Sequence, residues 1–292
     1  MGDFHQSGEI TTLHRFGSRD IAKLEAEIKK LSRLRPIALV LPTIFTELKG
    51  AALPAILNEL KGVKYLKQII VTLGRFNKEQ FNYAKEFFSV LPQEVTLIWN
   101  DGPRVKKLYK LLDEKNVPAG SDGKGRSAWM AYGYILASEK SKVIVLHDCD
   151  VLTYSREFLA RLCYPVVNQD LDFEFCKGYY SRVTDRMHGR VTRLLVTPLL
   201  RALSKLLGDL DFLKYMDSFR YPLAGEFSMV ADLARVNRIP GDWGLEVGVL
   251  AEIYRNCSKK RICQVDICET YEHKHQPLSE EDTTTGLMKM SI

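Results

Sequence analysis

The stretch Val143-Ile-Val-Leu-His-Asp-Cys-Asp150 joins a run of apolar residues to two carboxylates that are one residue apart. The apolar run predicts a buried strand, and the aspartates mark its polar end. Two interpretations of Asp148 and Asp150 are open at this point. Carboxylates are hard oxygen ligands suited to Mg²⁺ or Mn²⁺, yet aspartate is also common where a strand simply ends.

Strand-like and helix-like segments alternate before this stretch. Apolar runs predict strands at 36–42, 68–72 and 95–99, and helical spacing predicts helices at 47–60, 78–91, 104–114 and 125–139. Such alternation predicts an α/β fold with a parallel sheet and helices on both faces. Because ligands bind beyond the carboxyl ends of the strands in such sheets, Asp148 and Asp150 are expected at the ligand edge.

In the second half of the chain the regular alternation of predicted strands and helices ends. The sequence contains no internal repeat, and no low-complexity linker separates the two halves. The pattern of the second half predicts strands at 173–180 and 262–267, helices at 194–207 and 245–256, and a glycine-containing turn at 222–226. A single two-part domain therefore fits better than two independent ones.

Composition narrows the class of protein. The 292 residues are 46% hydrophobic and 27% charged, which is typical of a globular chain with a sizeable core. Six cysteines without a CxxC pair favour a reducing compartment, and the absence of a signal peptide or membrane-span pattern predicts a cytoplasmic protein. The net charge of +6 is scattered, so we expect a small anionic substrate, no nucleic acid and no membrane.

A glycine-lysine segment, Asp122-Gly-Lys-Gly-Arg126, lies at the start of a predicted helix. Glycines allow a ligand to approach the backbone, a helix N-terminus favours an anion, and Lys124 adds a positive charge suited to phosphate. The alternative is a flexible turn with a solvated lysine.

A second helix start, His188-Gly-Arg-Val-Thr192, offers the guanidinium of Arg190 and the hydroxyl of Thr192. A phosphate or carboxylate would suit this place, because free N–H groups and a bidentate donor lie together there. An ordinary helix cap beside a surface arginine is the commoner outcome for such segments.

Three later segments carry further candidates. Pro222-Leu-Ala-Gly-Glu226 places one acid in a special turn, where it could bind a sugar hydroxyl, act as a base or cap the next segment. Gly241-Asp-Trp-Gly-Leu-Glu246 places another acid in the first turn of a helix, where the dipole favours it. Tyr271-Glu-His-Lys-His275 could complete a metal site, although exposed histidine pairs are more often inert.

The order of these motifs resembles that of the glucosyl-3-phosphoglycerate synthases, over about residues 41–277. The most specific parts are Gly189-Arg-Val-Thr192, with the Pro-Leu-Leu200 that follows it, and Pro222-Leu-Ala-Gly-Glu226. The resemblance implies a GT-A fold, a Rossmann-like nucleotide-diphospho-sugar transferase with a mixed central sheet and a C-terminal acceptor-binding portion. It divides the domain into an N-terminal extension (1–34), a nucleotide-sugar-binding half (35–152) and an acceptor-binding, metal-completing half (153–292).

The resemblance also implies an activity: metal-dependent transfer of glucose from UDP-glucose to the 2-hydroxyl of 3-phosphoglycerate, with retention of configuration, by a cytoplasmic homodimer that uses Mg²⁺ or Mn²⁺. Same-fold alternatives use GDP-mannose or accept glycerate, and an alternative of another class is a non-catalytic nucleotide-sugar or RNA-binding module. The site residues that it implies are the metal ligands Asp150 and His273, the donor contacts Pro42, Thr43, Glu47, Lys124 and Asp148, the hexose contact Glu226, and the acceptor contacts Gly189, Arg190 and Thr192.

The chain departs from the family pattern in three places. Leu73-Gly74-Arg75 stands where an Asp-Ser segment is frequent, and the spacing from Pro42 to Glu47 is one residue longer. Tyr271 stands where an arginine often assists the acceptor. The last residues, 285–292, resemble the beginning of an amphipathic helix, from which we expect a shortened form of a longer chain.

Overall fold

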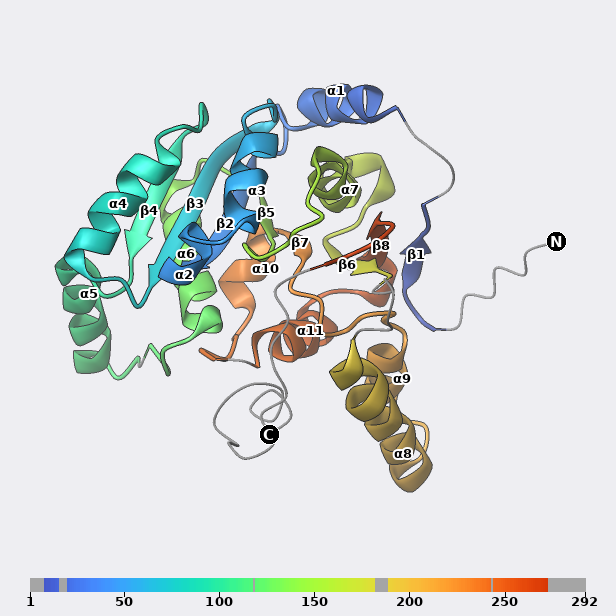
Figure 1. The fold of residues 1–292 in the computed structure, drawn as a ribbon. Helices are drawn as coiled ribbons and strands as arrows, with labels where there is room; N and C mark the ends of the chain where they lie inside the picture. The colour runs from blue at the N-terminus through green and yellow to red at the C-terminus, as the bar shows by residue number, and fades with distance from the viewer. Residues whose placement is uncertain (1–7, 16–19, 118, 182–188, 243, 273–292) are drawn as a thin grey trace.

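An eight-stranded sheet organises the chain in the computed structural model, which describes residues 8–15, 20–117, 119–181, 189–242 and 244–272 (Figure 1). The strand order is β1-β8-β6-β7-β5-β2-β3-β4. The strands are β1 (Thr11–Leu13), β2 (Ile37–Ile44), β3 (Leu66–Gly74), β4 (Val95–Trp99), β5 (Val143–Leu146), β6 (Phe175–Tyr180), β7 (Phe227–Val230) and β8 (Ile262–Cys268).

Eleven α-helices connect the described strands, with two short 3₁₀ turns, η1 (Gln169–Leu171) and η3 (Lys259–Arg261), and one π-helical turn, η2 (Thr192–Val196). The α-helices are α1 (Ile21–Leu31), α2 (Phe45–Leu48), α3 (Ala52–Leu60), α4 (Lys78–Phe88), α5 (Pro103–Glu114), α6 (Lys124–Ser138), α7 (Arg156–Val167), α8 (Thr197–Leu207), α9 (Asp211–Asp217), α10 (Ala231–Val236) and α11 (Leu245–Asn256).

One strand reverses the direction of the sheet. All other pairs of neighbours are parallel, but β7 is antiparallel to both β5 and β6, with Phe227 opposite Leu146 and Lys177. The mixed sheet that the family resemblance implies is therefore present, whereas the alternation of strands and helices alone predicted a parallel sheet. Because β7 runs backwards, its first residue lies at the edge where β5 and β6 end. The turn that precedes β7 is thus placed beside the aspartates that follow β5.

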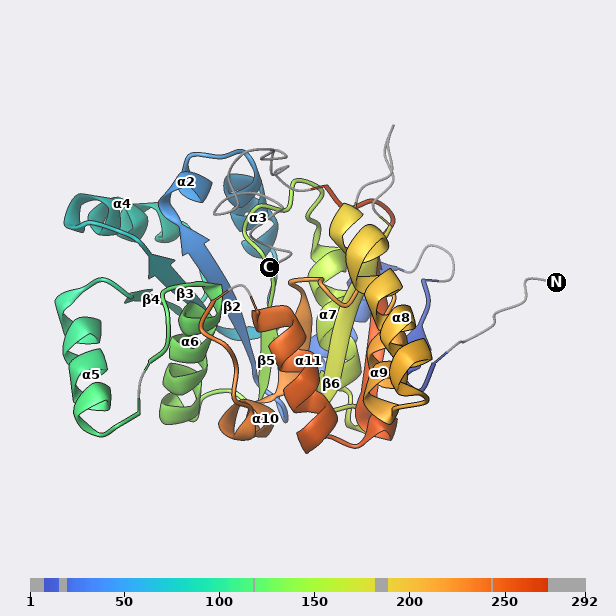
Figure 2. The same ribbon diagram turned by 90° about the horizontal axis from the view of Figure 1, so that it is seen from below.

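Apolar residues bury both faces of the sheet. One core contains Leu39 of β2 and packs under α1, α3, α4 and α7; the other contains Val40 of the same strand and packs under α6, α9, α10 and α11. The alternation of neighbouring residues between the two cores follows from the two-residue period of a strand. Figure 2 shows α6 and α11 on the face opposite to α3 and α4. The result is a three-layered α/β/α domain.

The predicted elements of the first half agree closely with the structure, apart from one helix. The segment 47–60 forms two helices, α2 and α3, which are separated at Lys49-Gly50-Ala51. Glycine is a poor helix former, and its backbone entropy favours a break there. In the N-terminal segment, β1 adds to the edge of the sheet beside β8, and α1 packs on α7.

The second half contains elements that hydrophobic periodicity did not predict: α7, α9, β7 and α10. Both β7 and α10 are short, at four and six residues, so too few positions repeat to reveal a period. The predicted helix at 194–207 starts earlier, as the π-helical turn η2, before α8. Among the described residues, none of the helices is both long and apolar enough to cross a bilayer.

Candidate active site at the carboxyl edge of the sheet

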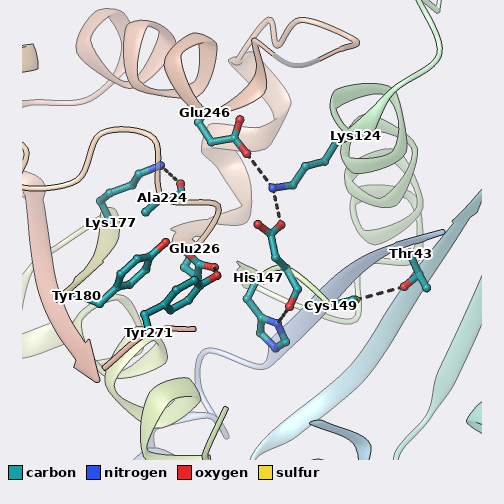
Figure 3. A network of polar contacts seen from close by, with 11 residues as sticks. Thr43, Lys124, His147, Cys149, Lys177, Tyr180, Ala224, Glu226, Glu246 and Tyr271 are labelled. Carbon is teal, nitrogen blue, oxygen red and sulfur yellow. Dashed lines mark hydrogen bonds and ion pairs between the residues drawn. The ribbon is translucent and has the colours of Figure 1, made fainter. Parts of the chain in front are cut away.

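The candidate site lies where β2, β5 and β6 end and β7 begins. Helices α6 and α11 begin at the same edge, so their N-terminal turns face the residues that follow β5. Figure 3 shows Lys124 of α6 and Glu246 of α11 pointing toward each other above the end of β5. Residues that lie far apart in the sequence are thereby brought together by the strand order alone.

An ion network joins three of these elements. Lys124 Nζ lies 2.5 Å from Asp148 Oδ1 and 2.7 Å from Glu246 Oε1. Burial on its own would lower the pKa of Lys124, but the two carboxylates raise it well above its usual range. Lys124 is therefore a fixed ammonium whose two carboxylate partners leave one N–H proton for a further acceptor.

The glycines around Lys124 are required by close packing. Gly123 and Gly125 lie against the turn 240–242, where an added Cβ on Gly125 would be 1.8 Å from the carbonyl oxygen of Pro240. The amide of Arg126 donates to the carbonyl of Gly241 at 2.7 Å. The two glycine-rich motifs of the sequence are thus one unit, which sets the start of α6 against the segment that leads to α11.

Glu226 is a buried carboxylate held by two tyrosines. The hydroxyl of Tyr180 donates to Oε2 at 3.0 Å and that of Tyr271 to Oε1 at 2.6 Å, while the two rings stack with centroids 3.7 Å apart. Burial, and then the charge of Asp148, raise the pKa of Glu226 to about 7, and the two hydroxyls oppose that rise. Tyr271 thus supports Glu226 in this chain.

Three carboxylates gather near the end of β5. Burial raises the pKa of Glu47 to about 8, the amide of Ile44 opposes this by donating to Glu47 Oε2 at 3.0 Å, and the charges of Asp150 and Asp148 add to the rise. Mutual repulsion of this kind is what a divalent cation relieves, and carboxylate oxygens are its preferred ligands. The carboxylate of Asp150, which adds its charge to this cluster, therefore suits Mg²⁺ or Mn²⁺.

The second expected metal ligand, His273, lies outside the described residues. Within the described part of the chain, no group of three His, Cys, Asp or Glu residues is arranged to hold a metal ion.

The side chain of Thr43 faces the interior. It is 3% exposed, and its hydroxyl lies 3.1 Å from the carbonyl oxygen of Leu41 and 3.3 Å from Cys149 Sγ. Burial raises the pKa of the Cys149 thiol well above its usual range, as expected for a small packed residue. A ligand at this strand end would therefore meet Pro42, which is partly exposed, rather than the side chain of Thr43.

The expected acceptor residues lie at the beginning of the η2–α8 segment. Gly189 has a φ of 75°, in the left-handed region that glycine adopts easily, and Arg190 is exposed. Thr192 is buried, and its hydroxyl has no hydrogen-bond partner among the described residues. Arg190 is therefore the polar residue of this segment that an anion can reach in this structure.

The sequence alone did not assign a role in the site to four residues that the structure places there: Glu246, Lys177, Tyr180 and His147. The sequence marks Glu246 only by its place at a helix start, and its pairing with Lys124 depends on tertiary contact. His147 is fully buried, and its Nδ1 donates to the carbonyl of Asp148 at 2.8 Å. Burial lowers the pKa of His147 to about 4, so it stays neutral and supports the backbone of Asp148.

Comparison with known proteins gives a consistent set of relatives. No family model matches the chain. The glucosyl-3-phosphoglycerate synthase of Persephonella marina is 50% identical over 291 residues, which cover 100% of this chain and 72% of the relative. That of Methanococcoides burtonii is 42% identical and covers 99% of this chain and 70% of the relative.

Among solved structures, the fold is similar to a crystal structure of glucosyl-3-phosphoglycerate synthase from Mycobacterium tuberculosis in complex with Mn²⁺, uridine diphosphate and phosphoglyceric acid. The TM-score is 0.68 at 22% identity, over 97% of this chain and 82% of the solved one. This likeness establishes the fold.

Proposed function

Because this chain belongs to the glucosyl-3-phosphoglycerate synthase family, we propose that it transfers glucose from UDP-glucose to the 2-hydroxyl of 3-phosphoglycerate, giving glucosyl-3-phosphoglycerate and UDP. The observation that carries the proposal beyond family membership is the meeting of Lys124, Asp148, Glu246 and Glu226 at one edge of the sheet. A fixed ammonium, acids for a divalent ion and a buried acid for a sugar are what this transfer requires.

We assign the donor side to the ends of β2 and β5 and the start of α6. Pro42, Thr43 and Glu47 would contact the uridine, and Asp148 the nucleotide. Lys124 would donate its remaining N–H to the diphosphate. Its ammonium is fixed by two carboxylates before the substrate arrives, so little reorganisation is needed as charge develops on the leaving group.

We assign the metal to Asp150 and His273, with the ion being Mg²⁺ or Mn²⁺. Solved complexes of the Mycobacterium tuberculosis enzyme contain Mn²⁺ or Mg²⁺ together with uridine diphosphate. When bound, the ion would supply charge neutralisation at the diphosphate. Asp148 and Asp150 follow a fully buried strand, so their backbone positions are set by the core rather than by the ligand.

We assign the acceptor to Gly189, Arg190 and Thr192. The guanidinium of Arg190 suits bidentate binding of a phosphate or carboxylate, and the buried hydroxyl of Thr192 supplies a further donor. An acceptor held there would present its hydroxyl on the face of the sugar from which UDP departs, which gives retention. Glu226, fixed by two tyrosines, would contact the hexose.

The decisive experiment incubates the chain with Mg²⁺ or Mn²⁺, 3-phosphoglycerate and a panel of sugar nucleotides. We expect UDP and glucosyl-3-phosphoglycerate to appear together, and chelation of the metal to stop both. Turnover with GDP-mannose, or with glycerate in place of 3-phosphoglycerate, would correct the donor or the acceptor. Binding of a sugar nucleotide without turnover for any donor would identify a binding module instead.

We further propose that the protein is a homodimer and lies in the cytoplasm. Helix α8 has no buried residue and exposes Leu199, Leu206 and Leu207, with Leu206 80% exposed. Apolar side chains gathered on one surface are typical of contact with a partner. Light scattering after size exclusion, and fractionation of the cells, test these two proposals.

A further inference from the structure

Lys177 is a buried lysine whose ammonium is paired with a neutral group. It lies on β6, is 0% exposed, and its Nζ donates to the carbonyl of Ala224 at 2.5 Å. Figure 3 shows the side chain reaching from β6 to the turn before β7. Within the described part of the chain, this carbonyl is its one hydrogen-bond acceptor, and the ring of Phe227 lies 5.5 Å from Nζ.

The next residue on β6 holds the same turn at a second point. The amide of Gly178 donates to the carbonyl of Glu226 at 2.9 Å. An added Cβ on Gly178 would lie 3.1 Å from the Cβ of Glu226 and 2.9 Å from a methyl group of Ile267, so little side chain fits there. Two neighbouring residues of β6 thus fix the carbonyls on either side of Gly225.

Gly225 is the point at which this turn meets the ion network. An added Cβ would lie 2.4 Å from Asp148 Oδ2 and 2.8 Å from Lys124 Nζ. The backbone of the turn therefore packs directly against the two charged groups. A small movement of the carbonyl of Ala224 would shift Gly225 against Asp148 and would also move the side chain of Glu226.

Stability alone does not account for a lysine at this position. A buried ammonium costs free energy, and a neutral carbonyl offsets less of that cost than a carboxylate does. Burial lowers the pKa of Lys177 to about 8; the charges of Glu246, Glu226 and Asp148 oppose that effect, and Lys124 reinforces it. An apolar residue of similar length would fill the same space without this cost.

We propose that Lys177 is a positioning residue for glucose transfer: by holding the carbonyl of Ala224 it sets the Gly225–Glu226 turn against Asp148 and Lys124. This inference rests on the proposed function, because it gives Glu226 the contact with the hexose. Lys177 itself touches no part of the donor: it acts through the turn, most directly on Glu226, which follows Gly225, and less directly on Asp148 and Lys124.

The test compares Lys177→Met with Lys177→Gln. These replacements have similar volumes, but only glutamine keeps an N–H donor for the carbonyl of Ala224. Calorimetry in the presence of Mn²⁺ measures the Kd values of UDP and UDP-glucose, and steady-state kinetics measures transfer. For Lys177→Met we expect a loss of about 10- to 100-fold in kcat/KM for UDP-glucose, and a larger weakening of UDP-glucose binding than of UDP binding. Lys177→Gln should recover part of the loss.

Tyr215→Phe is the matched control, because it removes another buried hydrogen bond, from the Tyr215 hydroxyl to the carbonyl of Leu250, in the core under α9 and α11. It should lower the melting temperature without changing the ratio of the two Kd values. The inference is overturned if Lys177→Met keeps the wild-type ratio, or if both ligands weaken equally. Failure of the wild-type chain to transfer glucose would overturn the proposed function. The ratio of the Kd values of UDP-glucose and UDP would still decide whether Lys177 positions the turn.

Discussion

Lys124 Nζ lies 2.7 Å from Glu246 Oε1, so the first turn of α6 is joined by an ion pair to the first turn of α11. Glu246 favours a helix start for local reasons, because a carboxylate interacts well with the helix dipole there. Its position also gives Lys124 a second anion besides Asp148. One side chain therefore serves both the stability of α11 and the arrangement of the site.

Replacing Lys124 by Met should lower both stability and turnover. The change leaves Asp148 and Glu246 near each other without a cation, so we expect the free energy of unfolding to fall by about 1–3 kcal/mol and turnover to fall about 100-fold. Denaturant titration and a transfer assay measure the two effects. Adding Glu246→Gln to Lys124→Met should restore part of the stability but none of the turnover.

The control for this prediction is Lys140→Met, which removes an exposed ion pair with Glu94. Exposed pairs contribute little, so its melting temperature and turnover should match those of the wild type. A loss of stability equal to that of Lys124→Met would contradict a special role for the network.

Gly225→Ala should reduce glucose transfer sharply, because its Cβ would lie 2.4 Å from Asp148 Oδ2. We expect a drop of about 100-fold in kcat/KM, since displacement of catalytic groups by about an ångström has effects of that size. Gly133→Ala is the control: Gly133 lies in the interior of α6, and nothing lies within 4 Å of its added Cβ. It should raise the free energy of unfolding by about 0.5–1 kcal/mol and leave transfer unchanged.

The pH dependence of stability should reveal the buried carboxyl of Glu226, whose pKa is raised from 4.5 to about 7. Between these values the unfolded chain releases the proton while the folded chain keeps it. Since the unfolded state then binds fewer protons, this group makes stability fall as the pH rises from about 4.5 to about 7.

Glu226→Gln lacks this titration and provides the measurement. Unfolding free energies of both proteins at pH 5 and pH 8 should show the variant gaining relative to wild type as the pH rises, by about 1.4 kcal/mol for each unit of the pKa shift. Parallel curves for the two proteins would show that Glu226 titrates normally.

Arg190→Ala should weaken binding of the acceptor and leave binding of the donor unchanged. Loss of a bidentate, charge-assisted contact predicts that the acceptor's KM rises about 10- to 100-fold, while the KM for UDP-glucose stays within about twofold of wild type. Initial rates with each substrate varied in turn measure both constants. Arg201→Ala, which changes an exposed arginine further along α8, should alter neither constant. Equal increases in both constants for Arg190→Ala would remove this residue from the acceptor site.

The sequence predicted the strands and helices of the first half of the chain well, because most of its strands are strongly apolar. Strands β2, β3 and β5 are buried on both faces, so apolar runs such as Val143–Leu146 stand out, and the structure has that strand at the predicted bounds. The four-residue strand β7 is different, because its direction depends on its partners and leaves no trace in its own residues.

Site residues could be predicted where neighbouring residues in the sequence mark them. They could not be predicted where their role depends on contacts between distant segments. Lys124 and Glu226 stand in glycine-containing turns, which mark them in the sequence, and both lie at the expected edge. Tyr180 lies inside a strand pattern, so nothing local distinguishes it from an ordinary packing residue. In the sequence, Lys177 is one polar residue in an alternating strand pattern. Its contact with Ala224 depends on the pairing of β6 with β7, which the sequence pattern does not predict.

The reversed strand β7 also limits how the enzyme can move. It pairs with β5, which leads to the donor groups, and with β6, which carries Lys177 and Tyr180, so the two halves of the domain share an unbroken ladder of backbone hydrogen bonds. A hinge between the halves would have to break that ladder. The spacing between the residues that follow β5 and those at the end of β6 is therefore built into the sheet.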